Sequence, residues 1–204
     1  MNEALELAVV IPTFNELRNV PVLIAKLDAA LAGRRWEAIF VDDDSPDGTA
    51  QAARDLALRD ARVRVIQRIG RRGLSSACIE GICATAAPAV AVIDGDLQHD
   101  ETLLPQMLDA LQADGALDLV IGSRFVAGGG TGDWDQDRVA KSALATRLSR
   151  YVLKADLSDP MSGFFMIRTA VARALVPGLS AIGFKILLDI MTASPRPLKF
   201  LELP

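Results

Sequence analysis

The amino-acid sequence predicts a three-layer α/β domain with a mostly parallel central sheet. Short apolar runs alternate with longer segments of helical periodicity through the first part of the chain, which is the pattern of α/β proteins. Polar residues follow several of these runs directly. The 204 residues are 50% hydrophobic, which is the composition of a folded domain with a full core rather than of a disordered chain.

The predicted strands are apolar runs of four to six residues. Pro12 cannot donate to a sheet ladder and is expected to end the first run. The runs are Leu7–Ile11, Ala38–Val41, Val63–Ile66, Val90–Ile93, Leu117–Ile121 and Leu198–Leu203, and a short apolar strand is expected after the turn at Asp159–Phe165.

The predicted helices have apolar residues at every third or fourth position, which forms a stripe that packs against a sheet. They are Leu17–Leu31, a helix after Thr49 through about Leu58, a helix after Ser76 ending near Ala86, the segment carrying Leu103 to Leu111, Gln136–Lys154 and Ile182–Met191.

The alternation of strands and helices stops after residue 126. The glycines between residues 128 and 132 neither follow a strand nor open a helix, which is typical of a lid or hinge. The helix Gln136–Lys154 has a basic face, which is either simply solvated or directed at a membrane surface or an anionic substrate.

Charge and cysteine content exclude some classes of protein. A net charge of −4 argues against a nucleic-acid-binding domain, which is expected to be basic. Cys78 and Cys83 lie in an apolar helical pattern that predicts two buried free thiols rather than a zinc knuckle or a disulfide framework. The sequence has neither a recognisable signal peptide nor a run of about 18 apolar residues. These features predict a cytoplasmic domain, with contact to a membrane surface left open.

The segment Asp94-Gly95-Asp96 is the central candidate for a chemical site. It follows the run Val90–Ile93 directly, and the glycine lets the backbone turn so that both carboxylates converge. Converging carboxylates repel each other unless a cation lies between them, and Mg²⁺ or Mn²⁺ is the usual cation in such oxygen-rich sites. The alternative is an ordinary polar turn before a helix that begins near Asp100.

Three other polar clusters also follow predicted strands: Asn15-Glu16, Asp42-Asp43 and Ser123-Arg124. Ligands of parallel α/β sheets bind beyond the carboxyl ends of the strands. We therefore expect these clusters and Asp94-Asp96 to share one site. Independent surface loops are the alternative.

The polar clusters stand in motifs that resemble those of inverting glycosyltransferases of family 2. These motifs are Pro12–Glu16, Val41–Thr49 and Asp94–His99. Further segments are similar to the polyprenol (dolichol) phosphate mannosyltransferases, so that the resemblance spans essentially the whole chain. They are Arg72–Ser76, Gly122–Val126, Asp159-Pro160, Ser162–Phe165 and Ile182–Leu187.

The resemblance implies a nucleotide-diphospho-sugar transferase fold of the GT-A type, a divalent metal (Mg²⁺ or Mn²⁺), a GDP-mannose donor and a polyprenyl phosphate acceptor. By motif position, we expect the base and ribose at Pro12, Phe14, Glu16, Val41 and Asp43. The metal and the diphosphate are expected at Asp94, Asp96 and Gln98, and the phosphates or the acceptor at Arg124, Arg138 and Ser142.

Among these residues, the resemblance implies catalytic roles for Asp96, Arg124 and Arg138. Arg138 and Ser142 are four positions apart on one face of their predicted helix, which makes a joint role possible. His99 stands beside the metal motif and is expected to support it or to be structural.

The implied reaction suits these residue types. A leaving diphosphate needs its negative charge neutralised, which a metal and arginines supply without proton transfer. The acceptor is a phosphate monoester with a second pKa of about 6, so it is already an anion near neutral pH and needs no strong general base.

Two alternatives stay open. UDP-glucose is the alternative donor, because glucosyltransferases that use undecaprenyl phosphate share the stretch Asp94–His99, whereas Ser45–Thr49 and Phe184-Lys185 favour mannose. The second alternative is a non-catalytic nucleotide-sugar-binding fragment, against which the intact Asp94, Asp96 and Arg124 argue. A nucleotidyltransferase or a dehydrogenase needs a glycine-rich loop after the first strand, which this sequence lacks.

We expect residues 1–204 to form a single glycosyltransferase catalytic domain, with the nucleotide-binding part at about 1–126 and the acceptor side at about 127–204. Related enzymes continue into a basic segment, and many bacterial ones then carry transmembrane helices. The resemblance therefore predicts that a C-terminal tail or membrane region is absent here. It also predicts a peripheral location at the cytoplasmic face of a membrane, with an anchoring region or subunit as a possible partner.

Overall fold

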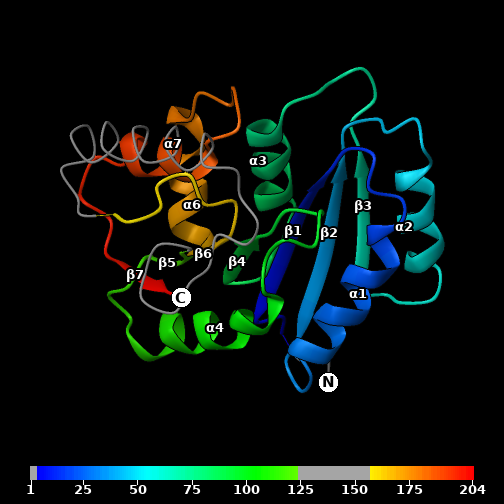
Figure 1. Cartoon of the computed structure of the whole chain (residues 1–204). Coiled ribbons are helices and arrows are strands. Elements are labelled where there is room, and N and C mark those ends of the chain that lie inside the picture. Colours follow the sequence, from blue (N-terminus) through cyan, green and yellow to red (C-terminus); the bar gives the residue numbers. More distant parts are fainter. Residues whose placement is uncertain (1–3, 124–156) are drawn as a thin grey trace, which may run out of the picture.

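The computed structural model describes residues 4–123 and 157–204. They form a seven-stranded sheet with helices on both faces (Figure 1), in the strand order β3-β2-β1-β4-β6-β5-β7. Every neighbouring pair is parallel except the two pairs that contain β6. The predicted three-layer α/β class with a mostly parallel sheet is therefore confirmed.

The strands are β1 (Leu7–Thr13), β2 (Trp36–Asp42), β3 (Val63–Gln67), β4 (Ala89–Val92), β5 (Leu119–Gly122), β6 (Phe165–Arg168) and β7 (Phe200–Leu203). The helices are α1 (Asn19–Ala30), α2 (Thr49–Ala57), α3 (Leu74–Ala84), α4 (Leu104–Ala113), α6 (Thr169–Leu175) and α7 (Ile186–Ala193), with short 3₁₀ turns η1 (Glu101–Leu103) and η2 (Val176–Gly178).

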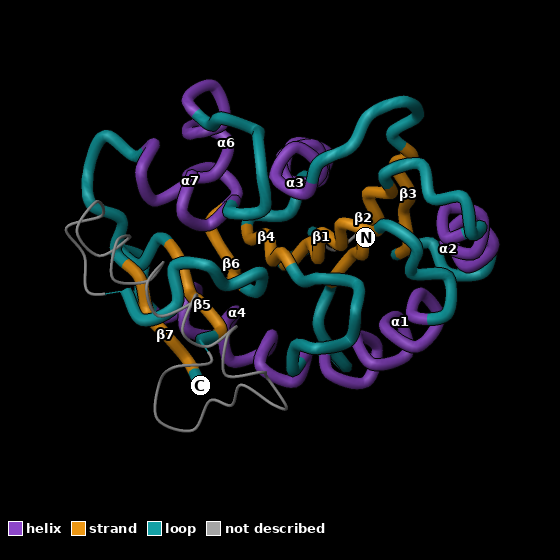
Figure 2. Tube along the Cα trace, turned by 45° about the horizontal axis from the view of Figure 1, so that its top comes forward, coloured by secondary structure: helices purple, strands orange, loops and turns teal. Residues whose placement is uncertain are grey.

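The sheet separates two hydrophobic cores (Figure 2). Helices α1, α2 and α4 cover one face, and α3, α6 and α7 cover the other. Alternate residues of β1 enter the two cores: Leu7 and Val9 face α1 and α4, whereas Ala8 and Val10 face α3. A strand covered on both faces has a continuous apolar sequence, which explains why the apolar runs located the central strands.

The prediction that Pro12 ends the first strand is wrong, because β1 continues through Pro12 to Thr13. The carbonyl of Thr13 accepts a hydrogen bond from Asp43 on the β2 side, whereas the carbonyl of Val10 accepts one from Ile93 on the β4 side. Pro12 therefore turns its nitrogen toward β4, whose pairing with β1 ends at the Val10 position. No ladder hydrogen bond is lost, so a proline is tolerated there.

The region after β6 also differs from the prediction. Helix α7 begins at Ile186 rather than at Ile182, because Ala181 and Gly183 have φ values of 58° and 89°, which no right-handed helix can contain. Helix α6 was not predicted, since seven residues are too few for a periodic pattern. The predicted helix Gln136–Lys154 lies outside the described residues.

The two cysteines differ in environment. Cys78 is buried as predicted, but Cys83 is exposed, and both are free thiols. Five positions along an α-helix correspond to a rotation of about 140°, so one narrow buried face cannot hold both side chains. Within residues 4–123 and 157–204, no helix has the length and apolar composition needed to cross a bilayer.

Candidate functional site

A cavity of about 550 Å³ opens at the carboxyl ends of β1, β2 and β4. This is the edge at which parallel α/β sheets bind ligands. The cavity brings together side chains that follow three different strands, and segments before α3 and α7 complete it. Its lining consists of Pro12, Thr13, Phe14, Glu16, Asp43, Arg72, Gly73, Leu74, Asp94, Gly95, Asp96 and Phe184.

The loop after β1 is held in place by the segment Ser45–Thr49. The hydroxyl of Ser45 accepts a hydrogen bond from the backbone N–H of Asn15 at 3.0 Å, and the hydroxyl of Thr49 accepts one from Glu16 at 2.9 Å. Asn15 has a φ of 63°, a left-handed conformation that asparagine tolerates better than most residues. The polar motif after β2 therefore fixes the loop that brings β1 side chains to the cavity.

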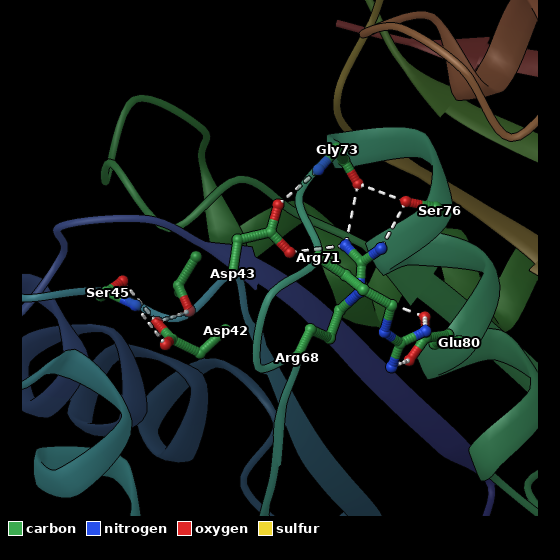
Figure 3. A network of polar contacts seen from close by, with 9 residues as sticks. Asp42, Asp43, Ser45, Arg68, Arg71, Gly73, Ser76 and Glu80 are labelled. Atoms are coloured by element: carbon green, nitrogen blue, oxygen red, sulfur yellow. Dashed lines mark hydrogen bonds and ion pairs between the residues drawn. The ribbon is translucent and has the colours of Figure 1, made fainter.

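The two consecutive carboxylates at the end of β2 have different surroundings (Figure 3). Asp42 is fully buried and accepts hydrogen bonds from both the backbone N–H and the hydroxyl of Ser45, which makes it a structural residue. Asp43 lines the cavity and accepts from Arg68 at 2.5 Å and from the backbone N–H of Gly73 at 2.6 Å. Each carboxylate oxygen can accept a second hydrogen bond, so Asp43 can also accept from a ligand.

Arg68 is a site residue that the sequence analysis missed. Its side chain is only 2% exposed, and besides Asp43 it contacts Glu80 and Ser76 on α3 and the carbonyl of Gly73. This single guanidinium joins the end of β3, the end of β2 and the start of α3. The position of Arg68 after a strand beside the acidic end of β2 was the available signal, because buried cations are stable only next to anions.

An aromatic side chain forms part of the cavity mouth. The guanidinium of Arg72 lies 4.4 Å from the centre of the Phe14 ring, and both side chains line the cavity. Phe14 is 41% exposed, which leaves ring surface accessible to a ligand. The sequence analysis assigned Phe14 to this site but gave Arg72 no role.

Asp94 has an oxygen without a protein partner. Among the residues that the structure describes, Asp94 Oδ1 is buried and makes no hydrogen bond. Asp94 Oδ2 lies 3.4 Å from His99 Nε2, so His99 borders this carboxylate. A buried oxygen that lacks a partner calls for a ligand, an ion or a water to satisfy it.

The environment of Glu16 indicates that negative charge accumulates beside Asp94. Burial is the largest factor that raises the pKa of Glu16, and the neighbouring charges of Asp96, Asp47 and Asp94 raise it further. A hydrogen bond from Asn19 opposes this rise. Clustered carboxylates are stabilised by a cation, so this part of the cavity suits a positively charged ligand.

The carboxylates of Asp94 and Asp96 fit a divalent cation that is also bound by phosphates. The described part of the chain contains no cluster of three or more His, Cys, Asp or Glu side chains placed to hold a metal. Mg²⁺ sites commonly use one or two carboxylates, with water and substrate phosphates completing the shell. Asp96 is exposed and its carboxylate accepts from the backbone N–H of Gln98 at 3.1 Å, which orients it.

Some of the predicted site residues lie elsewhere. Val41 is fully buried in the core on the α3 face, so its side chain does not line the cavity. Gln98 is exposed and is not part of the cavity lining. Arg124, Arg138 and Ser142 lie outside the described residues.

Comparisons with known proteins agree with this architecture. The structure is similar to that of glucosyl-3-phosphoglycerate synthase from Mycobacterium tuberculosis, crystallised with Mn²⁺, uridine diphosphate and phosphoglyceric acid, with a TM-score of 0.69. The match has 20% identity and covers 98% of this chain and 70% of that one. This likeness confirms the predicted GT-A fold.

Sequence comparison identifies closer relatives. The chain is 39% identical over 189 residues to the dolichol-phosphate mannosyltransferase of Pyrococcus furiosus, which covers 92% of this chain and 52% of that protein. It is 34% identical over 199 residues to the dolichol-phosphate mannosyltransferase of Saccharomyces cerevisiae, a match that covers 95% of this chain and 73% of that protein. The chain thus spans about half the length of the first relative. The sequence model for glycosyl transferase family 2 matches residues 8–176, and the chain belongs to that family.

Proposed function

We propose that this chain is the catalytic domain of an inverting glycosyltransferase that moves mannose from GDP-mannose to a polyprenyl monophosphate with the help of a divalent metal. The observation that carries the proposal is the cavity at the ends of β1, β2 and β4, where a buried oxygen of Asp94 has no partner among the residues that the structure describes. The two relatives named dolichol-phosphate mannosyltransferases support the sugar and the class of acceptor.

In this proposal the nucleoside binds between the ends of β1 and β2. Phe14 offers an exposed aromatic ring for stacking, and Asp43 offers acceptor capacity for the N–H groups of the base. Pro12 and Glu16 complete this wall, whereas Val41 is buried in the core and does not line the cavity. Arg68 holds the Asp43 carboxylate toward the base.

The diphosphate binds next to Asp94 and Asp96, which would hold Mg²⁺ or Mn²⁺, with Gln98 next to them. When bound, the cation neutralises the charge that develops on the leaving diphosphate. Asp96 is oriented for this role by the backbone N–H of Gln98. His99 supports the Asp94 carboxylate from the side.

The acceptor phosphate approaches from the side of residues 127–204, with Arg124, Arg138 and Ser142 as its predicted contacts. Because the acceptor is already an anion near neutral pH, none of the described residues has to act as a strong general base. A lipid-linked acceptor also implies that the domain works at a membrane surface, which we propose to be the cytoplasmic face.

The proposal is tested by calorimetric titration of GDP, GDP-mannose and UDP-glucose in the presence of Mn²⁺. We expect binding of both guanine nucleotides, loss of that binding in Asp96→Ala, and retention in Asp55→Ala. Asp55 is an exposed carboxylate on α2 that does not line the cavity, so this variant controls for the loss of one negative charge.

The outcomes separate the competing functions. A preference for uridine nucleotides would show that the donor is a UDP-sugar instead of GDP-mannose. The assignment as a glycosyltransferase would not change. The mannosyl assignment also requires transfer from GDP-mannose to a short-chain polyprenyl phosphate. Binding of nucleotide without transfer would favour a nucleotide-sugar-binding fragment.

A further inference from the structure

We propose that Gly163, and the turn that carries it, set the position of the Asp94 carboxylate, so that Gly163 is a positioning residue for binding of the metal and diphosphate. The inference rests on the proposed function for its consequence, but its structural basis is independent of that function. It concerns a segment that approaches the cavity from the second half of the chain and to which no role has been assigned.

The backbone of Gly163 lies directly against Asp94. A Cβ atom added at Gly163 would stand 2.3 Å from Asp94 Oδ2 and 2.9 Å from its Cγ, which is far inside normal contact distance. Gly163 is not among the described glycines with positive φ, so its backbone conformation is open to other residues. A glycine is therefore required here because a side chain has no room beside the Asp94 carboxylate, and not because of the backbone conformation.

The turn that carries Gly163 is firmly anchored on β5. The hydroxyl of Ser162 is buried and donates to the carbonyl of Gly122 at 2.7 Å, and it also accepts from the backbone N–H of Phe164 at 3.1 Å. The ring of Phe164 packs so closely on Gly122 that a Cβ there would stand 2.5 Å from the ring. With these contacts the turn cannot retreat easily from Asp94.

His99 also lies next to the Oδ2 atom of Asp94. Its Nε2 atom lies 3.4 Å from Asp94 Oδ2, and its ring lies 5.4 Å from the ring of Phe164. Gly163 and His99 thus both lie against Oδ2, and Phe164 packs on His99, whereas Oδ1 is buried and has no hydrogen-bond partner among the described residues. Residues that orient metal ligands typically change metal affinity by about 10–100-fold when they are altered.

A side chain at position 163 should therefore displace the carboxylate rather than unfold the protein, because an aspartate side chain can rotate. The experiment measures Mn²⁺ affinity by electron paramagnetic resonance for wild type and Gly163→Ala, with whichever of GDP and UDP the wild type binds. We expect affinity at least about tenfold weaker in Gly163→Ala, with an unchanged circular dichroism spectrum.

Gly115→Ala is the matched control. Gly115 is exposed, has no atom within 4 Å of an added Cβ, and does not have positive φ, so this variant should bind Mn²⁺ like wild type. Equal affinity of Gly163→Ala and wild type for Mn²⁺ would overturn the proposal.

A thermal double-mutant cycle tests the same contact without any metal. In the Asp94→Ala background the new methyl group meets no carboxylate, so we expect Gly163→Ala to lower the melting temperature less there than in wild type. Equal losses in the two backgrounds would overturn the inference. If Gly163→Ala does not fold, recovery of folding in the double variant supports the contact, and failure to recover overturns it.

The cycle also separates this inference from the proposed function. If wild type binds no Mn²⁺ with either nucleotide, the metal-dependent function fails, while the melting temperatures still decide whether Gly163 positions Asp94. If wild type binds Mn²⁺ and the cycle shows no coupling, the proposed function stands and the inference fails.

Discussion

Neighbouring side chains at the end of β2 illustrate how the site is built at the scale of single residues. Asp42 faces the interior and closes a turn, whereas Asp43 faces the cavity and is held by Arg68. A buried charge removed from such a network leaves its partners without compensation, which costs far more than loss of an exposed ion pair. Arg68 and Arg71 allow a direct comparison, because both contact Glu80 (Figure 3).

We expect Arg68→Met to lower the free energy of unfolding by about 3–5 kcal/mol, because the buried carboxylate of Asp43 loses its cationic partner. Arg71 is 59% exposed, so Arg71→Met should cost less than about 1 kcal/mol. Urea unfolding followed by circular dichroism measures both values. Similar losses in the two variants would contradict the assigned role of Arg68. At urea concentrations at which both variants are folded, Arg68→Met should also bind nucleotide more weakly than Arg71→Met.

Sequence reasoning located the four carboxylates that line the cavity and missed residues that contact them. Glu16, Asp43, Asp94 and Asp96 follow strands, and the rule for parallel sheets brings such positions together. Arg68 contacts Asp43, and Gly163 lies against Asp94, across segments far apart in the chain, and these partners cannot be read from a local pattern alone. Val41 stands in a matching motif, but alternation along β2 turns its side chain into the core.

At the scale of elements, β5 and β7 are joined by a polar clamp as well as by their ladder. Asp118 accepts two hydrogen bonds from Arg196, both at 2.7 Å, and one from the backbone N–H of Lys199 at 2.8 Å. These donors, above all Arg196, hold the pKa of Asp118 below its usual range, although burial opposes the effect.

The clamp predicts a specific pH dependence. Because the folded-state pKa of Asp118 is lowered, its contribution to stability is present above the unfolded value of about 3.9 and is lost as the pH falls through the folded value. Asp118→Asn should therefore unfold at lower urea concentration than wild type at pH 7, and the difference should shrink at pH 3. The exposed variant Asp55→Asn should show no such change. A constant difference between Asp118→Asn and wild type at both pH values would contradict the prediction.

Elements with long or strongly apolar patterns could be predicted, and short ones could not. The central strands were found because both of their faces are buried. Their ends were less certain: β1 passes through Pro12 because its nitrogen faces a side without a ladder partner. The start of α7 depended on left-handed residues at Ala181 and Gly183, which a helical pattern of apolar residues does not reveal.

At the scale of the whole molecule, β6 connects the two parts of the sheet. It pairs antiparallel with β4 on one side and with β5 on the other. The amino end of β6 therefore lies beside the carboxyl end of β4, which is why a turn preceding β6 reaches Asp94. The site thus depends on both parts of the chain, although most of its lining comes from the first.

This connection predicts which strands are stabilised when a ligand binds at the site. A ligand at 100 times its dissociation constant stabilises the folded state by about 2.7 kcal/mol. With Mn²⁺ and GDP, we expect amide hydrogen exchange to slow in β6 as well as in β1 and β4. Asp96→Ala in the same mixture should show no slowing. Protection of β1 and β4 without β6 would contradict the coupling.

The antiparallel strand also has a consequence during synthesis on the ribosome. β4 can pair with β1 as soon as both have emerged, but its other edge waits for Phe165–Arg168. At about 5–20 residues per second, the intervening stretch of roughly 70 residues takes about 4–15 s to appear. During that interval the nascent chain presents an apolar strand edge, which is a template for unwanted pairing. A nascent-chain chaperone that shields the run Val90–Ile93 would protect this edge during that interval.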